Sequence, residues 1–391
     1  MKRGRYSWVA LSLSLASATA AAQTGDYAAF LRSVADRSPQ AVAAERELAA
    51  TVRGWRTGLA PDDPEAGIEY YFAGETRYEI TVEQTFDFPT VYHQRNKISR
   101  LNISKAEREY GAARRAIMEA ASDAYLELNY TAERVAILTQ RRDDMRRAIG
   151  LYEAGLEVGE GSVLELRNAQ MLLTGIENGL TLAETDRRAA SARLAQLNGG
   201  TEVAPQGYPQ FGFTGTQEEF VAAALAADYG LQAAAIDTLI AQRELRLSRH
   251  EWIPKLKVGY KAEVEGSRAT SALLAGISVP LWQNSGRTRH ARAIGEAAEA
   301  QHAATEAEAR MRFNTLYTRY RSLMQALTDR QCDRSGEDYP DLLREAAAAG
   351  KITSIDALMG LEGWYAMRDS LMELEYEVAR AAAAMALCLI D

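Results

Sequence analysis

Several residue types are scarce in this chain of 391 residues, and each scarcity excludes a class of protein. Two cysteines are too few for the disulfide framework of small exported domains. The chain has no G-x-S-x-G motif of the kind that holds the nucleophile of hydrolases. It also has no glycine-rich loop after a predicted strand that could bind a phosphate group. The four histidines show no metal-ligand spacing; they are His93, His250, His290 and His302. We therefore expect no catalytic residue, no metal site and no cofactor, and infer that the chain is not an enzyme.

Basic residues are outnumbered by acidic ones, 45 to 53, and long apolar runs are scarce. Lys2, Arg3 and Arg5 precede a short apolar run and the small residues Ala20-Ala21-Ala22, which together predict a cleaved secretory signal peptide over residues 1–22. Its loss changes the formal net charge from −8 to −11, so nucleic acid is not an expected partner. No later run reaches the ~18 apolar residues of a membrane-spanning helix.

Proline is also rare, with nine residues in the chain, and this leaves room for long helices. Alanine, glutamate, arginine and leucine crowd the proline-free stretches, a composition typical of coiled coils. In two of them the apolar residues step by four and three alternately, which is the coiled-coil period. Four long helices are therefore expected, at about Val91–Tyr152, Ser162–Leu197, Arg287–Cys332 and Ser354–Leu389.

Two segments between the helices alternate apolar and polar residues, which predicts strand hairpins at residues 66–86 and 255–280. Ala73–Thr76 is the expected turn of the first hairpin, and Gly266–Thr270 that of the second. Each strand has the length of a tilted strand that crosses a membrane. Two amphipathic hairpins on a soluble domain are the alternative. Because no other hydrophobic core is available for them to cover, we expect strands of a membrane barrel.

The chain is also an internal duplication. Pro280 follows Pro89, and Gly350 follows Gly159, at the same spacing of 191 residues. The first repeat, residues 23–200, is expected to hold N-terminal helices, the first strand hairpin and a helical hairpin at 91–197. The second repeat, residues 201–391, is expected to hold helices, the second strand hairpin and a helical hairpin at 287–389. Each descending segment would reach roughly 95 Å at ~1.5 Å per residue, too far for a compact domain.

Both helical hairpins turn on the pattern G-x-x-[ST]-x-x-[DE]. The glycines Gly159 and Gly350 permit a tight turn, and the hydroxyls of Ser162 and Thr353 are expected to cap the helices that follow. The acids Glu165 and Asp356 favour the positive ends of those helices.

These motifs resemble those of TolC-type outer-membrane efflux proteins. The resemblance rests on the run from Gly276 to Trp282 before Gly286-Arg287, on the two glycine turns, and on the Leu194–Gly199 ending of the second long helix. The turn sequences and the short chain are most similar to the heavy-metal, CzcC-like branch. The resemblance implies a homotrimer whose long helices form an α-barrel and whose strands, four per subunit, form one shared 12-stranded β-barrel.

The resemblance also implies where function lies. The expected subunit sits in outer-membrane lipid of a Gram-negative bacterium and extends into the periplasm, where it meets an adaptor (membrane fusion) protein and an inner-membrane RND-type pump. The hairpin tips would dock the adaptor through Gly155, Gly159, Ser162, Gly350, Thr353 and Ser354. Glu165 and Asp356 would be the acids of a narrow aperture.

This chain departs from the family pattern at the tip. The tyrosine and arginine of the family's closing contact correspond to Ala347 and Ile352, and a second acid corresponds to Met359. A different closing contact is therefore expected. Heavy-metal cations are the expected cargo; the alternatives are a TolC-like duct for drugs or secreted polypeptides, and a periplasmic coiled-coil scaffold or adaptor.

Two further expectations concern the second helical hairpin. Ser335–Pro340 should break the third long helix, because proline removes a hydrogen bond of the helix. Cys332 and Cys388 lie 18 residues before and 38 residues after the turn at Gly350. Along helices of ~1.5 Å per residue this separates them by roughly 30 Å, so both should be unpaired.

Overall fold

The structure is a computed structural model, and it describes residues 21–72, 77–159, 162–213, 215–280, 282, 284–331 and 338–390. The expected signal peptide lies outside these residues except for Ala21 and Ala22, which begin the first helix. The expected turn at Ala73–Thr76 and the residue Cys332 lie outside them as well.

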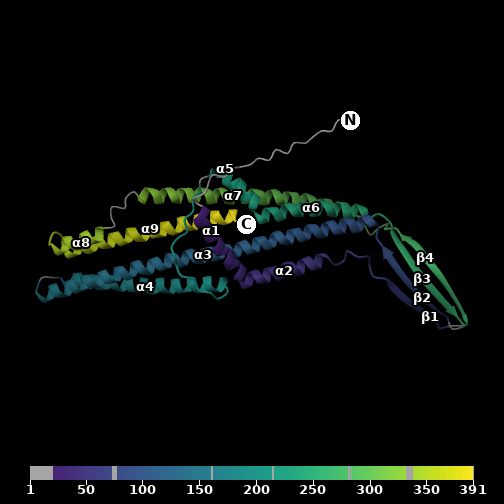
Figure 1. Cartoon of the computed structure of the whole chain (residues 1–391), viewed down its shortest axis with the longest axis horizontal. Helices are drawn as coiled ribbons and strands as arrows, with labels where there is room; N and C mark the ends of the chain where they lie inside the picture. Colours follow the sequence, from purple (N-terminus) through teal and green to yellow (C-terminus); the bar gives the residue numbers. More distant parts are fainter. Residues whose placement is uncertain are drawn as a thin grey trace, which may run out of the picture.

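The molecule is a long rod with the strands at one end and the tips of two helical hairpins at the other (Figure 1). Its elements are α1 (Ala21–Arg37), α2 (Pro39–Trp55), β1 (Glu65–Tyr71), β2 (Arg77–Phe86), α3 (Pro89–Glu157), α4 (Val163–Leu197), α5 (Gln217–Ala227), α6 (Tyr229–His250), β3 (Lys255–Glu265), β4 (Arg268–Ser278), α7 (Arg287–Gln331), α8 (Tyr339–Ala348) and α9 (Ser354–Leu389). The expected fold class, mainly helical with four strands and long paired helices, is confirmed.

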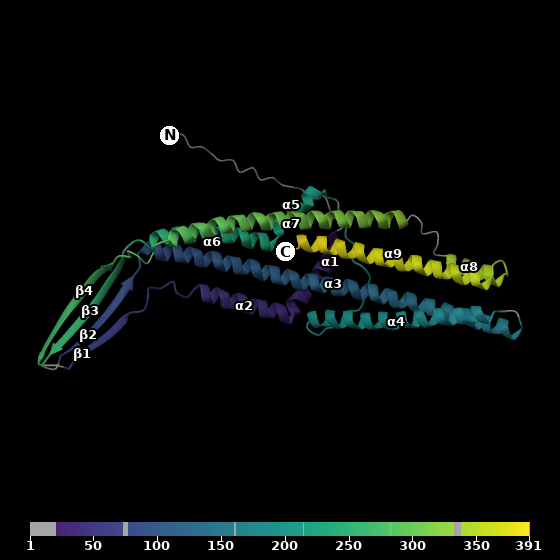
Figure 2. The ribbon, with the colours of Figure 1, turned by 180° about the vertical axis from the view of Figure 1, so that it is seen from behind.

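The two halves of the chain follow the same path. In each half a strand hairpin leads into a long helix that runs to the tip, and a second helix returns from it (Figure 2). In the second half the descending path is divided between α7 and α8, with residues 332–337 outside the described part. Pro340 stands in the first turn of α8, where its missing N–H has no helical partner to lose.

The four strands form one antiparallel sheet in the order β1-β2-β3-β4. Strands β2 and β3 belong to different halves of the chain, and they pair from Arg77↔Glu265 to Phe86↔Leu256. The sheet therefore joins the two halves, and it leaves β1 and β4 as its edges.

The faces of the sheet differ as the alternation predicts. Across β2 and β3, one face carries the ion pairs Glu79–Lys261, with Nζ 2.5 Å from Oε1, and Glu83–Lys257, with Nζ 2.9 Å from Oε2. The opposite face exposes large apolar side chains, among them Ile68 at 73%, Leu273 at 85% and Ile277 at 70%. A single copy of the chain thus leaves an apolar face without a partner among the described residues.

The turn of the second strand hairpin is shorter than expected. Residues 268–270 belong to β4, and Glu265 pairs directly with Arg268, so Gly266 and Ser267 alone make the connection. Gly266 has φ +58 and Ser267 does not have a positive φ, which is the pattern of a tight turn with glycine first. The expected connection Gly266–Thr270 was wrong because the polar residues after the turn continue the strand.

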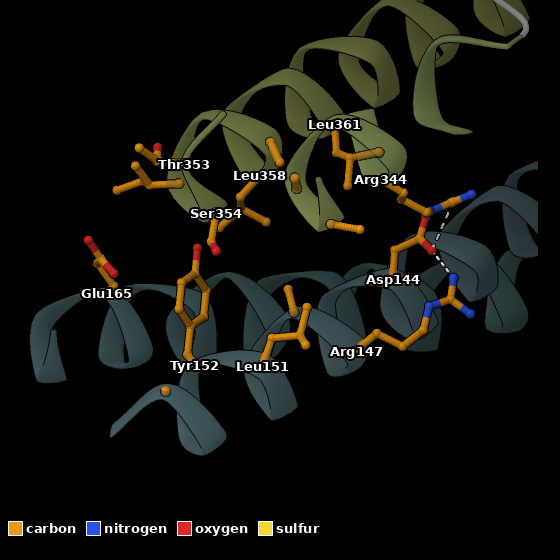
Figure 3. A pocket seen from close by; sticks show the side chains of 16 residues that line it. Asp144, Arg147, Leu151, Tyr152, Glu165, Arg344, Thr353, Ser354, Leu358 and Leu361 are labelled. Atoms are coloured by element: carbon orange, nitrogen blue, oxygen red, sulfur yellow. Dashed lines mark hydrogen bonds and ion pairs between the residues drawn. The ribbon is translucent and has the colours of Figure 1, made fainter. Parts of the chain in front are cut away.

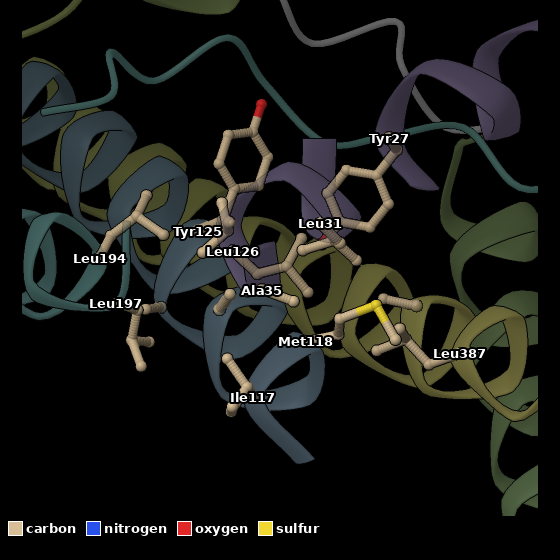
Figure 4. Packing of buried hydrophobic residues seen from close by; sticks show 14 of the residues in the cluster. Tyr27, Leu31, Ala35, Ile117, Met118, Tyr125, Leu126, Leu194, Leu197 and Leu387 are labelled. Carbon is tan, nitrogen blue, oxygen red and sulfur yellow. The ribbon is translucent and has the colours of Figure 1, made fainter. Parts of the chain in front are cut away.

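The largest core lies at mid-rod, where α1 crosses α3, α4 and the end of α9 (Figure 4). Leu31, Leu126 and Leu194 have no exposed surface there, and Leu387 has 2%. Most of the positions in α3 that step by four and three are buried, and Val135 is half-buried; the buried ones are Ile117, Ala121, Ala124, Leu128, Thr131 and Leu138. Among the described residues, no helix combines the length and the apolar character that crossing a membrane requires.

Cys388 lies near the end of α9, half-buried, and its thiol forms no disulfide. Burial raises the pKa of this thiol to about 11, with the charge of Glu119 adding to the effect. At neutral pH the thiol is therefore protonated and a weak nucleophile.

Candidate functional site: the tips of the helical hairpins

The first tip joins α3 to α4. The helix α3 ends at Glu157, and Gly159 follows in the left-handed region with φ +80, a conformation that glycine adopts without steric cost. Ser162 caps α4: its Oγ accepts a hydrogen bond from the N–H of Leu164 at 3.3 Å. Glu165 stands in the first turn of α4, and residues 160–161 lie outside the described part.

The second tip joins α8 to α9 by a Schellman turn. Gly350 has φ +67, its N–H donates to the carbonyl of Ala347, and the N–H of Lys351 donates to the carbonyl of Ala346. Thr353 caps α9: its Oγ1 accepts from the N–H of Asp356 at 3.1 Å and donates to Oδ2 of the same residue at 2.6 Å. The predicted capping by Ser162 and Thr353 is confirmed.

The two tips lie against each other and enclose a cavity of about 600 Å³, which we call the tip cavity (Figure 3). It is lined from both hairpins by Asp144, Arg147, Ala148, Leu151, Tyr152, Gly155, Glu165, Arg344, Ala347, Ala348, Thr353, Ser354, Ile355, Ala357, Leu358 and Leu361. Of the predicted tip residues, the structure brings Gly155, Glu165, Thr353 and Ser354 together here. Asp356 is exposed, and its carboxylate is engaged in the cap of α9.

A cluster of charged and aromatic residues closes the end of the cavity away from the turns. Asp144 of α3 has a side chain only 5% exposed, and its Oδ2 accepts from the Tyr365 hydroxyl of α9 at 2.6 Å. Arg344 of α8 places Nη2 3.1 Å from Oδ1 and 3.0 Å from Oδ2. Arg147 also pairs with this carboxylate. We call Asp144, Arg344 and Tyr365 the clasp, because they tie the first helical hairpin to both helices of the second.

A second ion pair supports the clasp about one helical turn before Asp144 on α3. Arg141 pairs with Glu362 of α9 through two nitrogens, and its guanidinium lies 5.5 Å from the ring centre of Tyr365. Tyr365 itself is 1% exposed. Burial raises the pKa of its hydroxyl, and the hydrogen bond to Asp144 raises it further, so the hydroxyl remains a donor at physiological pH.

The clasp was not among the contacts expected from the sequence. Asp144 and Arg344 are 200 residues apart, and Asp144 and Tyr365 are 221 apart, so no local spacing connects them. A charged residue at an inward helical position was the one available signal. Among the described residues, no group of three or more His, Cys, Asp or Glu side chains is placed to hold a metal ion.

Comparison with known proteins agrees with this geometry. A family model for outer membrane efflux proteins matches residues 74–200. No curated protein matches the chain. A membrane protein from Pseudomonas aeruginosa superposes with a TM-score of 0.78 at 15% identity, over 94% of this chain and 93% of that one.

Two outer membrane channels share the fold as well. The Campylobacter jejuni channel CmeC gives a TM-score of 0.75 at 14% identity, over 100% of this chain and 93% of that one. The Neisseria gonorrhoeae channel MtrE, in its open state, gives 0.74 at 15% identity, over 93% and 88%. At these identities the superpositions show the fold. The family-model match adds that residues 74–200 are similar to outer membrane efflux proteins.

Replacing glycine by alanine should have opposite effects on stability at Gly350, in the turn, and at Gly363, within α9. Gly350→Ala puts a Cβ into a left-handed turn and should destabilise the tip by about 1–2 kcal/mol. Gly363→Ala, at an exposed position within α9 with open space around it, should stabilise the helix by up to ~1 kcal/mol. Thermal unfolding of the purified protein followed by circular dichroism should show the midpoint falling in the first variant and rising in the second. A rise in both would mean that the turn at Gly350 differs from the one described.

Proposed function

We propose that this chain is the subunit of a homotrimeric outer-membrane efflux channel, a passive exit duct that docks a periplasmic adaptor and an inner-membrane pump. The observation that carries the proposal is the sheet at one end of the rod. Its apolar face is exposed, and its polar face carries ion pairs between side chains of neighbouring strands. Its edge strands β1 and β4 each lack a second strand partner among the described residues. Four strands cannot close a barrel, for which about eight are the minimum. Three copies supply 12 strands and leave no open edge.

The expected rival is a periplasmic coiled-coil scaffold. An apolar sheet face surrounded by lipid needs detergent for extraction, whereas a scaffold dissolves in plain buffer. We therefore expect the protein to require detergent and to run as a heat-modifiable trimer on a gel. Extraction as a monomer in detergent-free buffer would favour the scaffold.

Heavy-metal cations are the proposed cargo, and the support for them is the resemblance of the two turns to the CzcC-like branch. Drugs or secreted polypeptides are the alternative. Cells that express the channel with its cognate adaptor and pump should gain tolerance to zinc, cobalt or cadmium, and cells that lack only the channel should not. A gain in tolerance to drugs alone would assign the channel to the other cargo class.

The clasp is the proposed closing contact of this channel, in place of the family contact whose positions hold Ala347 and Ile352. Each of its three residues lies on a different helix, and together they fix the two hairpins side by side. If Asp144 loses its charge, Arg344 loses its ionic partner. This should reduce the stability of the closed arrangement relative to the open one by about 1–3 kcal/mol. The ratio of open to closed tips should then rise by roughly 5- to 150-fold.

Asp144→Asn should accordingly raise the resting conductance of single channels in planar bilayers, and Tyr365→Phe should raise it less. The matched control is Asp143→Asn, an identical change at the neighbouring, half-exposed position, where the carboxylate pairs only with adjacent Arg142 among the described residues. Equal conductance in Asp144→Asn and Asp143→Asn would remove the clasp from the gate.

Glu165 and Asp356 are the proposed acids of the aperture. Three copies of each would place six carboxylates around a narrow opening and favour cations. The double variant Glu165→Ala, Asp356→Ala should therefore reduce the cation preference measured as the reversal potential in a salt gradient. An unchanged reversal potential would place these acids away from the constriction.

A further inference from the structure

The tip cavity has the properties of a small-molecule site. Its volume of about 600 Å³ lies within the range of ligand pockets, and its walls are largely apolar. Ala148 and Leu151 line it from α3, and Leu358 and Leu361 line it from α9. The walls therefore come from both hairpins, and any occupant contacts both.

One buried polar group at the cavity has no partner. Tyr152 is 7% exposed, and its hydroxyl is buried without a hydrogen bond in the described part of the chain. Its side chain rises from α3 toward Ser354 on α9 (Figure 3). A buried hydroxyl left in this state is unfavourable, and a ligand that hydrogen-bonds to it removes that cost.

The two ends of the tip cavity differ in charge, with an acidic residue at one end and an excess of arginine at the other. Glu165 lines it beside Tyr152, near enough that its charge adds to burial in raising the pKa of the Tyr152 hydroxyl. No described residue forms an ion pair with Glu165. At the opposite end the carboxylate of Asp144 is saturated by its partners, and the arginines there outnumber it. A cationic group is therefore attracted to the Glu165 end and repelled from the clasp.

We propose that the tip cavity binds a small amphipathic organic amine. The ammonium group pairs with Glu165 and donates a hydrogen bond to the Tyr152 hydroxyl, and the apolar body lies between α3 and the side chains of Leu358 and Leu361. This site rests on the residues of one chain and does not depend on the proposed function.

The test uses dansylcadaverine, whose apolar dansyl group carries a primary amine on a flexible chain, and its neutral analogue N-butyl dansylamide. Each is titrated into the purified full-length protein in detergent, and the dansyl fluorescence is followed. We expect dansylcadaverine to bind saturably, and we expect the neutral analogue to bind about tenfold more weakly or not at all. Equal binding of the two compounds, or no saturable binding of either, would overturn the proposal.

Variants of two neighbouring acids locate the site. Glu165→Gln should weaken the binding of dansylcadaverine about tenfold, and Tyr152→Phe should weaken it several-fold. Glu153→Gln removes the same charge from an exposed position outside the cavity lining and should leave binding unchanged. Circular dichroism checks that each variant keeps its helices. An equal loss in Glu165→Gln and Glu153→Gln would reveal non-specific attraction of the amine and reject the site.

A consequence for gating rests on the proposed function. Because the occupant bridges the two hairpins, it should hold the tips together and lower the open probability of the channel in bilayers. Tyr152→Phe channels should need several-fold more dansylcadaverine for the same reduction. Fluorescence binding without any change in conductance would overturn the gating role and leave the site standing, whereas a protein that forms no channel at all would overturn the proposed function alone.

Discussion

The pairing of β2 with β3 fixes the axial position of everything else in the rod. These strands come from different halves of the chain, and their hydrogen-bonded register runs without interruption from Arg77↔Glu265 to Phe86↔Leu256. From the end of β2 at Phe86 to the turn at Gly159 there are 73 residues, and from the end of β4 at Ser278 to Gly350 there are 72. Two paths of nearly equal length that start from one sheet end at the same level. The tips meet for this reason, and the clasp and the tip cavity depend on their meeting.

The end of the rod opposite the sheet combines tight turns within each hairpin with the clasp, a charged contact between the two hairpins. The caps at Ser162 and Thr353 are formed within each hairpin, so they survive a movement of one hairpin against the other. The contacts of Asp144 with Arg344 and Tyr365 cross between hairpins and must break in such a movement. In the proposed gate, opening would therefore displace whole hairpins and keep each turn unchanged. The tip cavity lies on the dividing surface, so its volume changes in the same movement.

Local features of this molecule could be predicted from the sequence, and contacts between distant segments could not. The C-terminal end of α4, the start of α7, both ends of α9, the two caps and the alternation of the sheet all follow from patterns within a few residues. The second strand hairpin was misjudged at its turn, because Arg268-Ala269-Thr270 has the polarity of a loop and yet continues β4 opposite Glu265. The clasp was missed because its members are brought together by the equal lengths of the two paths. The exposed apolar face, by contrast, was predictable, since alternation alone determines it.

The central claim is that three copies close one sheet, each joining its β1 edge to the β4 edge of the next. Placing Gly67→Cys on β1 and Ala272→Cys on β4 tests it directly, because both positions lie on the polar face and hold small residues. Cys332 and Cys388 are replaced by serine in the same protein, and a flexible bis-maleimide links the introduced thiols in intact outer membranes. The account predicts covalent dimers and trimers on a denaturing gel, a ladder that stops at three, and no linkage in either single-cysteine variant. Monomers alone, or a ladder that continues beyond three, would contradict the closed three-fold barrel.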